Sequence, residues 1–212
     1  MAVRGAFHPL PDDNVPPLPG GAPAGTLVLL GWTGGRQWPA FAASPEARDG
    51  RPHPLDRWSR RVIDAAAVAL DAAAIYPFGG PPHRPFQRWA LRAEPVAHSP
   101  IGVLIHPDWG LWHAYRGALA FRERLPLADD PARASPCERC ADRPCLSACP
   151  VGAFSEHHGY DVPACTHHLR SPSGVACVSA GCLARRACPV APPYGEAQNA
   201  FHMRAFLRTR QA

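Results

Sequence analysis

The first half of the chain alternates between extended and helical patterns of apolar residues. Thr26–Gly31 is a short apolar run that ends at a glycine, which predicts a buried strand. Leu55–Ala74 predicts a long helix with Asp56 in its first turn, because its apolar residues recur at helical spacing. Pro85–Ala93 predicts a second, shorter helix that ends before Pro95. Helix alternating with strand predicts a small α/β layer domain.

Three other segments complete the predicted architecture. Ile101–His106 and Leu111–Ala120 flank a Pro-Asp-Trp-Gly turn and predict two strands paired with each other. Glu196–Arg210 predicts a closing helix with arginines at its negative end. Residues 1–25 are rich in proline, which predicts an extended arm or a disordered tail. We therefore expect an arm over 1–25, a small α/β domain over 26–130 and a cysteine-rich domain over 131–212.

Composition indicates a chain that folds around a core. The 212 residues are 46% hydrophobic and 18% charged, which is too apolar for a disordered chain. No apolar run approaches the length of a transmembrane helix, and the N-terminus lacks the apolar segment of a signal peptide. We therefore expect a cytoplasmic protein without a membrane partner.

The cysteines carry the chemical information. All eight fall between Cys137 and Cys188, and the first 136 residues contain none. Dense cysteine in a cytosolic chain indicates metal or redox chemistry rather than a disulfide framework. The residues form two groups of four, each of which ends in Cys-Pro: Cys137, Cys140, Cys145 and Cys149, then Cys165, Cys177, Cys182 and Cys188.

Three chemistries compete for these thiols. Paired zinc knuckles would repeat a C-x2-C or C-x4-C spacing, whereas the second group is spaced by eleven, four and five residues. Disulfides would require export from the cytosol. Cys145–Pro150 reproduces the C-x3-C-P ending of two-cluster ferredoxins, so we favour two [4Fe-4S] clusters and leave zinc and disulfides as alternatives.

The likeness to ferredoxins implies a particular pairing of the ligands. In those proteins the fourth cysteine of a motif binds the other cluster. Applied here, this rule puts Cys137, Cys140, Cys145 and Cys188 on cluster 1, and Cys165, Cys177, Cys182 and Cys149 on cluster 2. Two such sites carry a charge of about −4 and reduce the formal net charge from +5 to about +1. Four arginines lie between the ligands and either offset this charge or form a solvated surface: Arg139, Arg143, Arg185 and Arg186.

Residues 84–190 resemble the iron–sulfur module of epoxyqueuosine reductases, which are related to reductive dehalogenases. The likeness lies in Cys149-Pro-Val-Gly-Ala-Phe, in the lone Cys165-Thr-His-His-Leu, and in Gly181-Cys182 followed by Cys188-Pro. Ser99–Leu119 resembles the segment that precedes the first cluster motif in that family. The resemblance implies a mixed α+β fold, in which a nitroreductase-like α/β domain precedes a ferredoxin-like two-cluster domain. In the family, the first domain binds cobalamin and the clusters feed electrons to it for reduction of a tRNA base.

Two functions follow as hypotheses. The first is an iron–sulfur electron-transfer protein that passes single electrons to a partner reductase or receives them from a donor protein. The alternative is a self-contained reductase that binds a corrinoid or flavin and acts on tRNA. We favour the first, because Gly79–Arg84 has no carboxylate where the family has its proton donor.

Overall fold

The computed structural model has a mixed α+β fold and describes residues 1–128, 133–155, 157 and 159–209. The chain forms two compact units. Unit 1 comprises Met1–Pro95 and His113–Ala132, and unit 2 comprises Val96–Trp112 and Arg133–Ala212. Within the described part of the chain, no helix is both long enough and apolar enough to span a bilayer.

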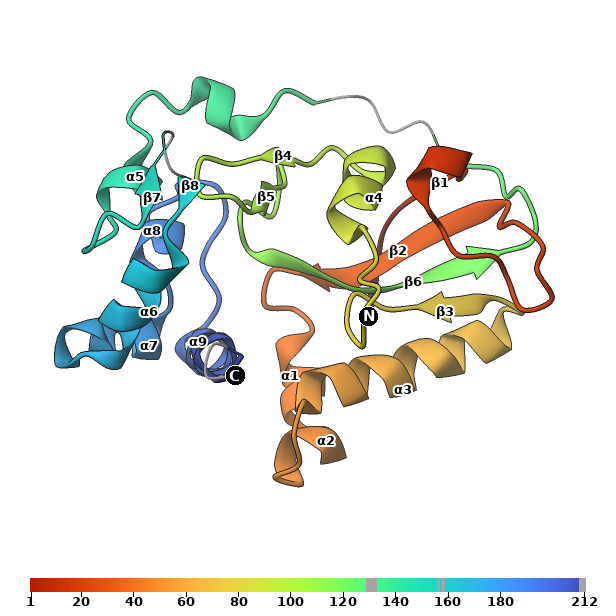
Figure 1. The fold of residues 1–212 in the computed structure, drawn as a ribbon, viewed down its shortest axis with the longest axis horizontal. Coiled ribbons are helices and arrows are strands. Elements are labelled where there is room, and N and C mark those ends of the chain that lie inside the picture. Colours follow the sequence, from red (N-terminus) through yellow and green to blue (C-terminus); the bar gives the residue numbers. More distant parts are fainter. Residues whose placement is uncertain (129–132, 156, 158, 210–212) are drawn as a thin grey trace. The chain divides into compact units, whose positions relative to one another are not determined.

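Unit 1 is built on an antiparallel sheet of order β1-β2-β6-β3 (Figure 1). The longest ladder joins β2 to β6, and it contains a bulge between Leu30 and Gly31. The elements of this unit are β1 (Ala2–Phe7), the 3-10 helix η1 (Pro11–Asp13), β2 (Thr26–Thr33), α1 (Trp38–Ala42), α2 (Pro45–Arg48), α3 (Pro54–Ala69), β3 (Ala73–Ile75), α4 (Phe86–Ala93) and β6 (His113–Phe121).

Helices cover both faces of this sheet (Figure 1). Ile63 and Ala67 of α3 pack against Leu30 and Leu119 on one face. On the other face α4 approaches β1 so closely that a Cβ at Gly5 would lie 2.1 Å from the carbonyl oxygen of Ala93. Glycine is therefore required at this point of the strand.

A buried ion pair ties β1 to the end of α4. Arg4 Nη2 lies 2.9 Å from Glu94 Oε1, and both side chains are almost fully buried. Arg4 also donates to the carbonyl oxygen of Trp32 at 2.8 Å, and the Tyr115 hydroxyl donates to Glu94. The charges are thus both paired and hydrogen-bonded, which is the condition for burying them at tolerable cost.

Most elements of unit 2 are short. An apolar cluster of this unit includes Ile101, Ile105, Leu111, Phe154 and Ala184, and several cysteines pack against this cluster. The elements are β4 (Ala97–His98), β5 (Leu104–Ile105), η2 (Pro136–Arg139), α5 (Pro144–Ser147), β7 (Phe154–Ser155), β8 (Gly159–Tyr160), α6 (Val162–Arg170), η3 (Pro172–Gly174), α7 (Val175–Ala180), α8 (Leu183–Arg186) and α9 (Glu196–Arg208).

Several elements expected from the sequence are present. β2 contains the predicted strand Thr26–Gly31 and extends it by two residues. α4 matches the predicted helix Pro85–Ala93. α9 matches the predicted closing helix as far as Arg208, whereas Arg210 lies outside the described residues.

The predicted helix Leu55–Ala74 is too long by five residues. α3 ends at Ala69, Asp71 adopts a left-handed backbone conformation with φ of 49°, and β3 follows. β3 pairs with β6, with Ala74 opposite Leu119. Alanine favours a helix, but here the hydrogen bonds of the sheet ladder decide its conformation.

The predicted pairing of Ile101–His106 with Leu111–Ala120 is wrong. β5 pairs with β4, and β6 pairs with β2 and β3. Each segment contains a strand, and the turn between them is as expected, since His106 and Gly110 exchange two backbone hydrogen bonds of 2.9 Å. β6 is nine residues long and finds a partner of nearly equal length in β2, which a two-residue strand cannot offer.

The N-terminal residues also differ from the expectation of an arm or a disordered tail. Ala2–Phe7 is the edge strand β1 of the sheet. The proline-rich connection after it is anchored, because Leu18 is buried and Trp89 Nε1 donates to the carbonyl oxygen of Asp13 at 2.8 Å. The compact units also differ from the expected boundary at 130/131. Unit 2 includes Val96–Trp112, which was expected to belong to the first domain.

Candidate functional site

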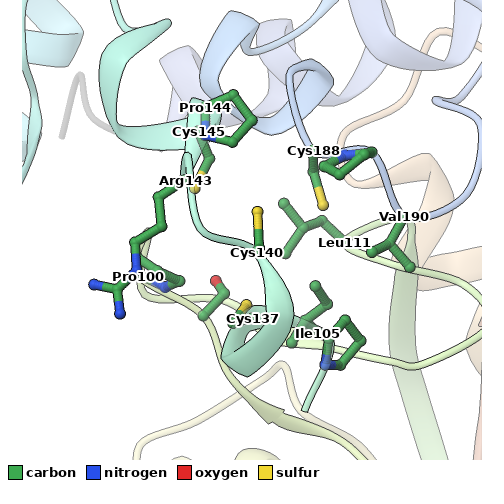
Figure 2. Close-up of a pocket in the computed structure, with 13 residues that line it drawn as sticks. Pro100, Ile105, Leu111, Cys137, Cys140, Arg143, Pro144, Cys145, Cys188 and Val190 are labelled. Atoms are coloured by element: carbon green, nitrogen blue, oxygen red, sulfur yellow. The ribbon is translucent and has the colours of Figure 1, made fainter.

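Four cysteines from three segments of unit 2 line a first pocket (Figure 2). Cys137 lies in η2, Cys140 directly follows it, Cys145 lies in α5, and Cys188 follows α8. The pocket has a volume of about 370 Å³, including space open to solvent. Apolar side chains of the β5 segment and its turn close one side of this pocket, among them Ile105 and Leu111.

Local backbone chemistry brings the first three of these thiols together. Ser135 caps η2 by accepting a hydrogen bond from the amide of Cys137 at 3.3 Å, and Pro136 begins the turn. The longer gap between Cys140 and Cys145 is taken up by Arg143, whose φ of 40° turns the chain before Pro144 starts α5. The two extra residues of this motif relative to ferredoxins thus lie in the bend before α5.

The other four cysteines line a second pocket of about 300 Å³, also partly open to solvent. Each of them comes from a different place on the chain. Cys149 follows α5, Cys165 lies in α6, Cys177 lies in α7, and Cys182 caps the start of α8. The remaining wall is mostly apolar and comes from Phe154, Leu169, Leu183, Ala184 and Met203, with His168 beside them.

Two short helices connect the pockets. α5 packs against α8, and each has a cysteine of the first set near one end and a cysteine of the second set near the other. For α5 these are Cys145 and Cys149, and for α8 they are Cys188 and Cys182. The structure therefore divides the eight thiols into the two sets that the ferredoxin rule names, and each set contains one cysteine from the other sequence group.

Burial controls the protonation of most of these thiols. It raises the pKa above that of an ordinary thiol, because removal from water disfavours the thiolate. A hydrogen bond with the Ser135 hydroxyl partly opposes this effect at Cys137, and one with the Tyr160 hydroxyl does so at Cys165. The raised pKa values belong to Cys137, Cys145, Cys165, Cys182 and Cys188. In both pockets burial therefore favours the neutral thiol over the thiolate.

Two polar groups approach sulfur atoms of the second pocket. The amide of Ala153 donates to Cys149 Sγ at 3.3 Å. The imidazole of His168 lies with Nε2 at 3.9 Å from Cys177 Sγ, and its other nitrogen is 3.5 Å from Ser173 Oγ. His168 is buried, whereas its neighbour His167 is exposed. Adjacent histidines are poorly placed to share one ion, but the sequence pattern does not show that one of them reaches a thiol.

The four arginines between the cysteines have different roles. Arg139, Arg143 and Arg186 are exposed. Arg185 instead hydrogen-bonds the carbonyl oxygen of Leu111 through Nε at 2.9 Å and also through Nη2. Its guanidinium lies 4.4 Å from the Trp112 ring centroid, so it joins α8 to the end of the Val96–Trp112 segment.

Each set of four cysteines lines a pocket. Among the residues that the structure describes, no group of three or more His, Cys, Asp or Glu side chains is arranged to hold a single metal ion. A tetrahedral zinc ion with bonds of about 2.3 Å would require sulfur atoms about 3.8 Å apart. A four-iron core holds each thiolate on a different iron and so takes a wider set.

Comparison with known proteins does not assign the chain to a family. No protein-family model matches the chain, and no curated protein matches it. The resemblance to epoxyqueuosine reductases therefore stays a prediction, and the function has to be argued from the residues of the chain itself.

Proposed function

We propose that this protein is an iron–sulfur electron-transfer protein, which holds two [4Fe-4S] clusters and passes single electrons to a partner reductase. The observation that carries this proposal is the division of eight cysteines into two sets of four, each at its own pocket. Four thiolates are the usual ligand set of one four-iron cluster. When bound, each cluster would supply a reversible one-electron couple.

The donor set favours iron–sulfur clusters over zinc and disulfides. Both pockets offer thiols and apolar walls, without a carboxylate among the residues that line them. All eight cysteines are free rather than paired as disulfides. Cys137, Cys140, Cys145 and Cys188 would hold the first cluster, and Cys149, Cys165, Cys177 and Cys182 the second.

We assign unit 2 to a ferredoxin-like class on the same grounds. The exchange of ligands through α5 and α8 is the arrangement by which two-cluster ferredoxins share their cysteine motifs. Assignment of unit 1 as a nitroreductase-like platform rests on the sequence resemblance, supported by an antiparallel sheet with helices on both faces.

Metal and sulfide content tests the proposal directly. Full-length protein purified without oxygen should contain about eight iron and eight sulfide per chain. Zinc without sulfide would overturn the proposal. Its absorption spectrum should show the broad shoulder of clusters alone, whereas the sharper bands of a corrinoid or flavin would favour the self-contained reductase that acts on tRNA.

Single cysteine variants test the assignment of ligands. We expect Cys188→Ser to damage the same cluster as Cys137→Ser, because both line the first pocket. Cys149→Ser should instead match Cys165→Ser. Each variant should leave about four iron per chain, and the electron paramagnetic resonance signal of the reduced survivor identifies which cluster remains. A match between Cys149→Ser and Cys137→Ser would mean that the ligands pair in sequence order.

A further inference from the structure

A histidine lies among the residues that line the second pocket. His168 comes from α6 and follows Cys165 by three residues, so the two share one face of the helix. Its Nε2 lies 3.9 Å from Cys177 Sγ, and both residues are buried. Among the described residues that line the first pocket there is no histidine, and the charged residue there, Arg143, is exposed (Figure 2). The two sets of thiols therefore differ in their polar surroundings.

The turn that follows α6 holds the backbone of His168 in place. The carbonyl oxygen of His168 accepts a hydrogen bond from the amide of Ser171 at 3.0 Å. A Cβ at Gly174 would lie 2.1 Å from the same oxygen, so the turn packs this closely only because glycine stands there. The turn leads directly into α7, the helix that contains Cys177. One short stretch of chain therefore positions both the imidazole and the thiol.

Two serines of this turn allow Nε2 of His168 to carry the hydrogen of the ring. The Ser171 hydroxyl lies 2.7 Å from the carbonyl oxygen of His168 and 2.7 Å from Ser173 Oγ. When it donates to Ser173, the Ser173 hydroxyl can donate to Nδ1 of His168, which is 3.5 Å away. Nε2 then carries the hydrogen and faces Cys177. A cysteine bound to iron has no hydrogen of its own, so Nε2 has to be the donor in this contact.

We propose that His168 is a positioning residue that acts through Cys177, where its hydrogen bond raises the reduction potential of the second-pocket cluster. This inference rests on the proposed function. One electron from the donor protein takes a four-thiolate cluster from a charge of about −2 to about −3, and part of the added charge lies on the sulfur ligands. A hydrogen bond to a ligand sulfur stabilises the more negative form more strongly, and burial strengthens this effect.

A redox titration followed by electron paramagnetic resonance tests this role on the full-length holoprotein. The second-pocket cluster is recognised by the signal that survives in Cys137→Ser. His168→Leu removes the donor, and we expect the equilibrium constant for reducing this cluster to fall about tenfold, which is ~59 mV for one electron. The first-pocket cluster should titrate unchanged.

His168→Gln separates hydrogen bonding from packing. Its amide can donate from about the position of Nε2, so we expect a smaller shift than in His168→Leu. His167→Leu is the matched control, because it makes the same change at the exposed neighbouring residue and should move neither potential. The inference is wrong if His168→Leu leaves the second-pocket potential unchanged, or if His168→Gln or His167→Leu lowers it as much as His168→Leu does.

Wild-type protein labelled with nitrogen-15 histidine covers the case in which His168→Leu does not fold or loses a cluster. Pulsed electron paramagnetic resonance should detect coupling of a labelled nitrogen to the reduced second-pocket cluster, and the absence of this coupling would overturn the inference. Iron and sulfide are measured in every sample. Clusters present with unshifted potentials refute the role of His168 alone, whereas wild-type protein without iron and sulfide refutes both this role and the proposed function.

Discussion

Unit 1 and unit 2 bury different kinds of atoms at their centres. In unit 1 many of the fully buried side chains are large and apolar, among them Leu27, Trp32, Ile63 and Trp89. In unit 2 the corresponding centre consists of a few apolar residues with cysteines packed against them. α5 and α8 have only four residues each, far fewer than a helix needs to persist alone in water.

This difference indicates how each unit is stabilised. Burial of apolar side chains against a continuous sheet can hold unit 1 without an external ligand. In unit 2 burial raises the pKa of thiols such as Cys145 and Cys182 and so disfavours their thiolate forms. Ligand binding and folding are therefore expected to be coupled in unit 2 and independent in unit 1.

The largest expected effect is that of removing the proposed clusters. Oxidation followed by chelation of iron should leave unit 1 folded and bring the opening free energy of amides in α5–α8 to about 0 kcal/mol. Hydrogen exchange resolved along the chain measures both units in one sample. Amides of β2 and β6, whose ladder lies wholly in unit 1, serve as the internal control. Protection of α5–α8 that survives complete removal of iron would contradict the coupling.

A cavity in the core of unit 1 should destabilise that unit without changing the iron content of the protein. Ile63→Ala removes buried methyl groups from the contact between α3 and the sheet, and we expect it to destabilise unit 1 by about 2–5 kcal/mol. Iron and sulfide content at low temperature should stay at the wild-type level. Ile63→Val is the conservative control, with an expected loss of about 1 kcal/mol. Loss of iron in proportion to the loss of stability would show that the two units do not fold independently.

The smallest expected effect is a loss of folding stability at low pH. Arg61 Nε donates a hydrogen bond of 2.5 Å to Glu46 Oε1. This hydrogen bond lowers the pKa of Glu46 from the ordinary 4.5 to about 2. A carboxyl with a lowered pKa in the folded state stabilises above its ordinary pKa, and this contribution disappears as the pH falls from about 4.5 toward 2. Because Arg61 is half exposed, we expect no more than about 1 kcal/mol.

Denaturation of cluster-free protein, followed by tryptophan fluorescence of unit 1, measures this contribution. Wild type and Glu46→Gln should differ most near pH 6 and converge as the pH approaches 2. A difference that does not change with pH would mean that the ion pair with Arg61 contributes nothing that titrates.

Local sequence patterns predict much of the secondary structure of unit 1 but little of the pairing between its strands. The strand at Thr26 and the helix α4 follow from apolar spacing and from the proline that ends the helix. The partner of β6 does not follow from such patterns, because register depends on a match of length and face with a strand distant in sequence. The end of α3 was missed for the same reason, since Ala73–Ile75 becomes a strand only when β6 is beside it.

The two cysteine sets show how much of the candidate site the spacing of residues in the sequence predicts. The Cys-Pro endings and the C-x3-C-P run are local signals, and the ferredoxin rule then names both sets of four. No comparable rule indicates that His168 faces Cys177, because that contact depends on the packing of α6 with α7.

The Val96–Trp112 segment limits how the two units can be separated. The chain leaves unit 1 after Pro95, contributes Ile105 and Leu111 to the wall of the first pocket, and returns to unit 1 at His113. A fragment that starts at residue 133 would contain every cysteine but lack two of the most buried side chains around them. Transplanting the cysteine module into another protein therefore requires a second piece of chain, supplied as an insertion or by circular permutation. In this protein, the residues that surround the cysteines do not form one continuous segment of the sequence.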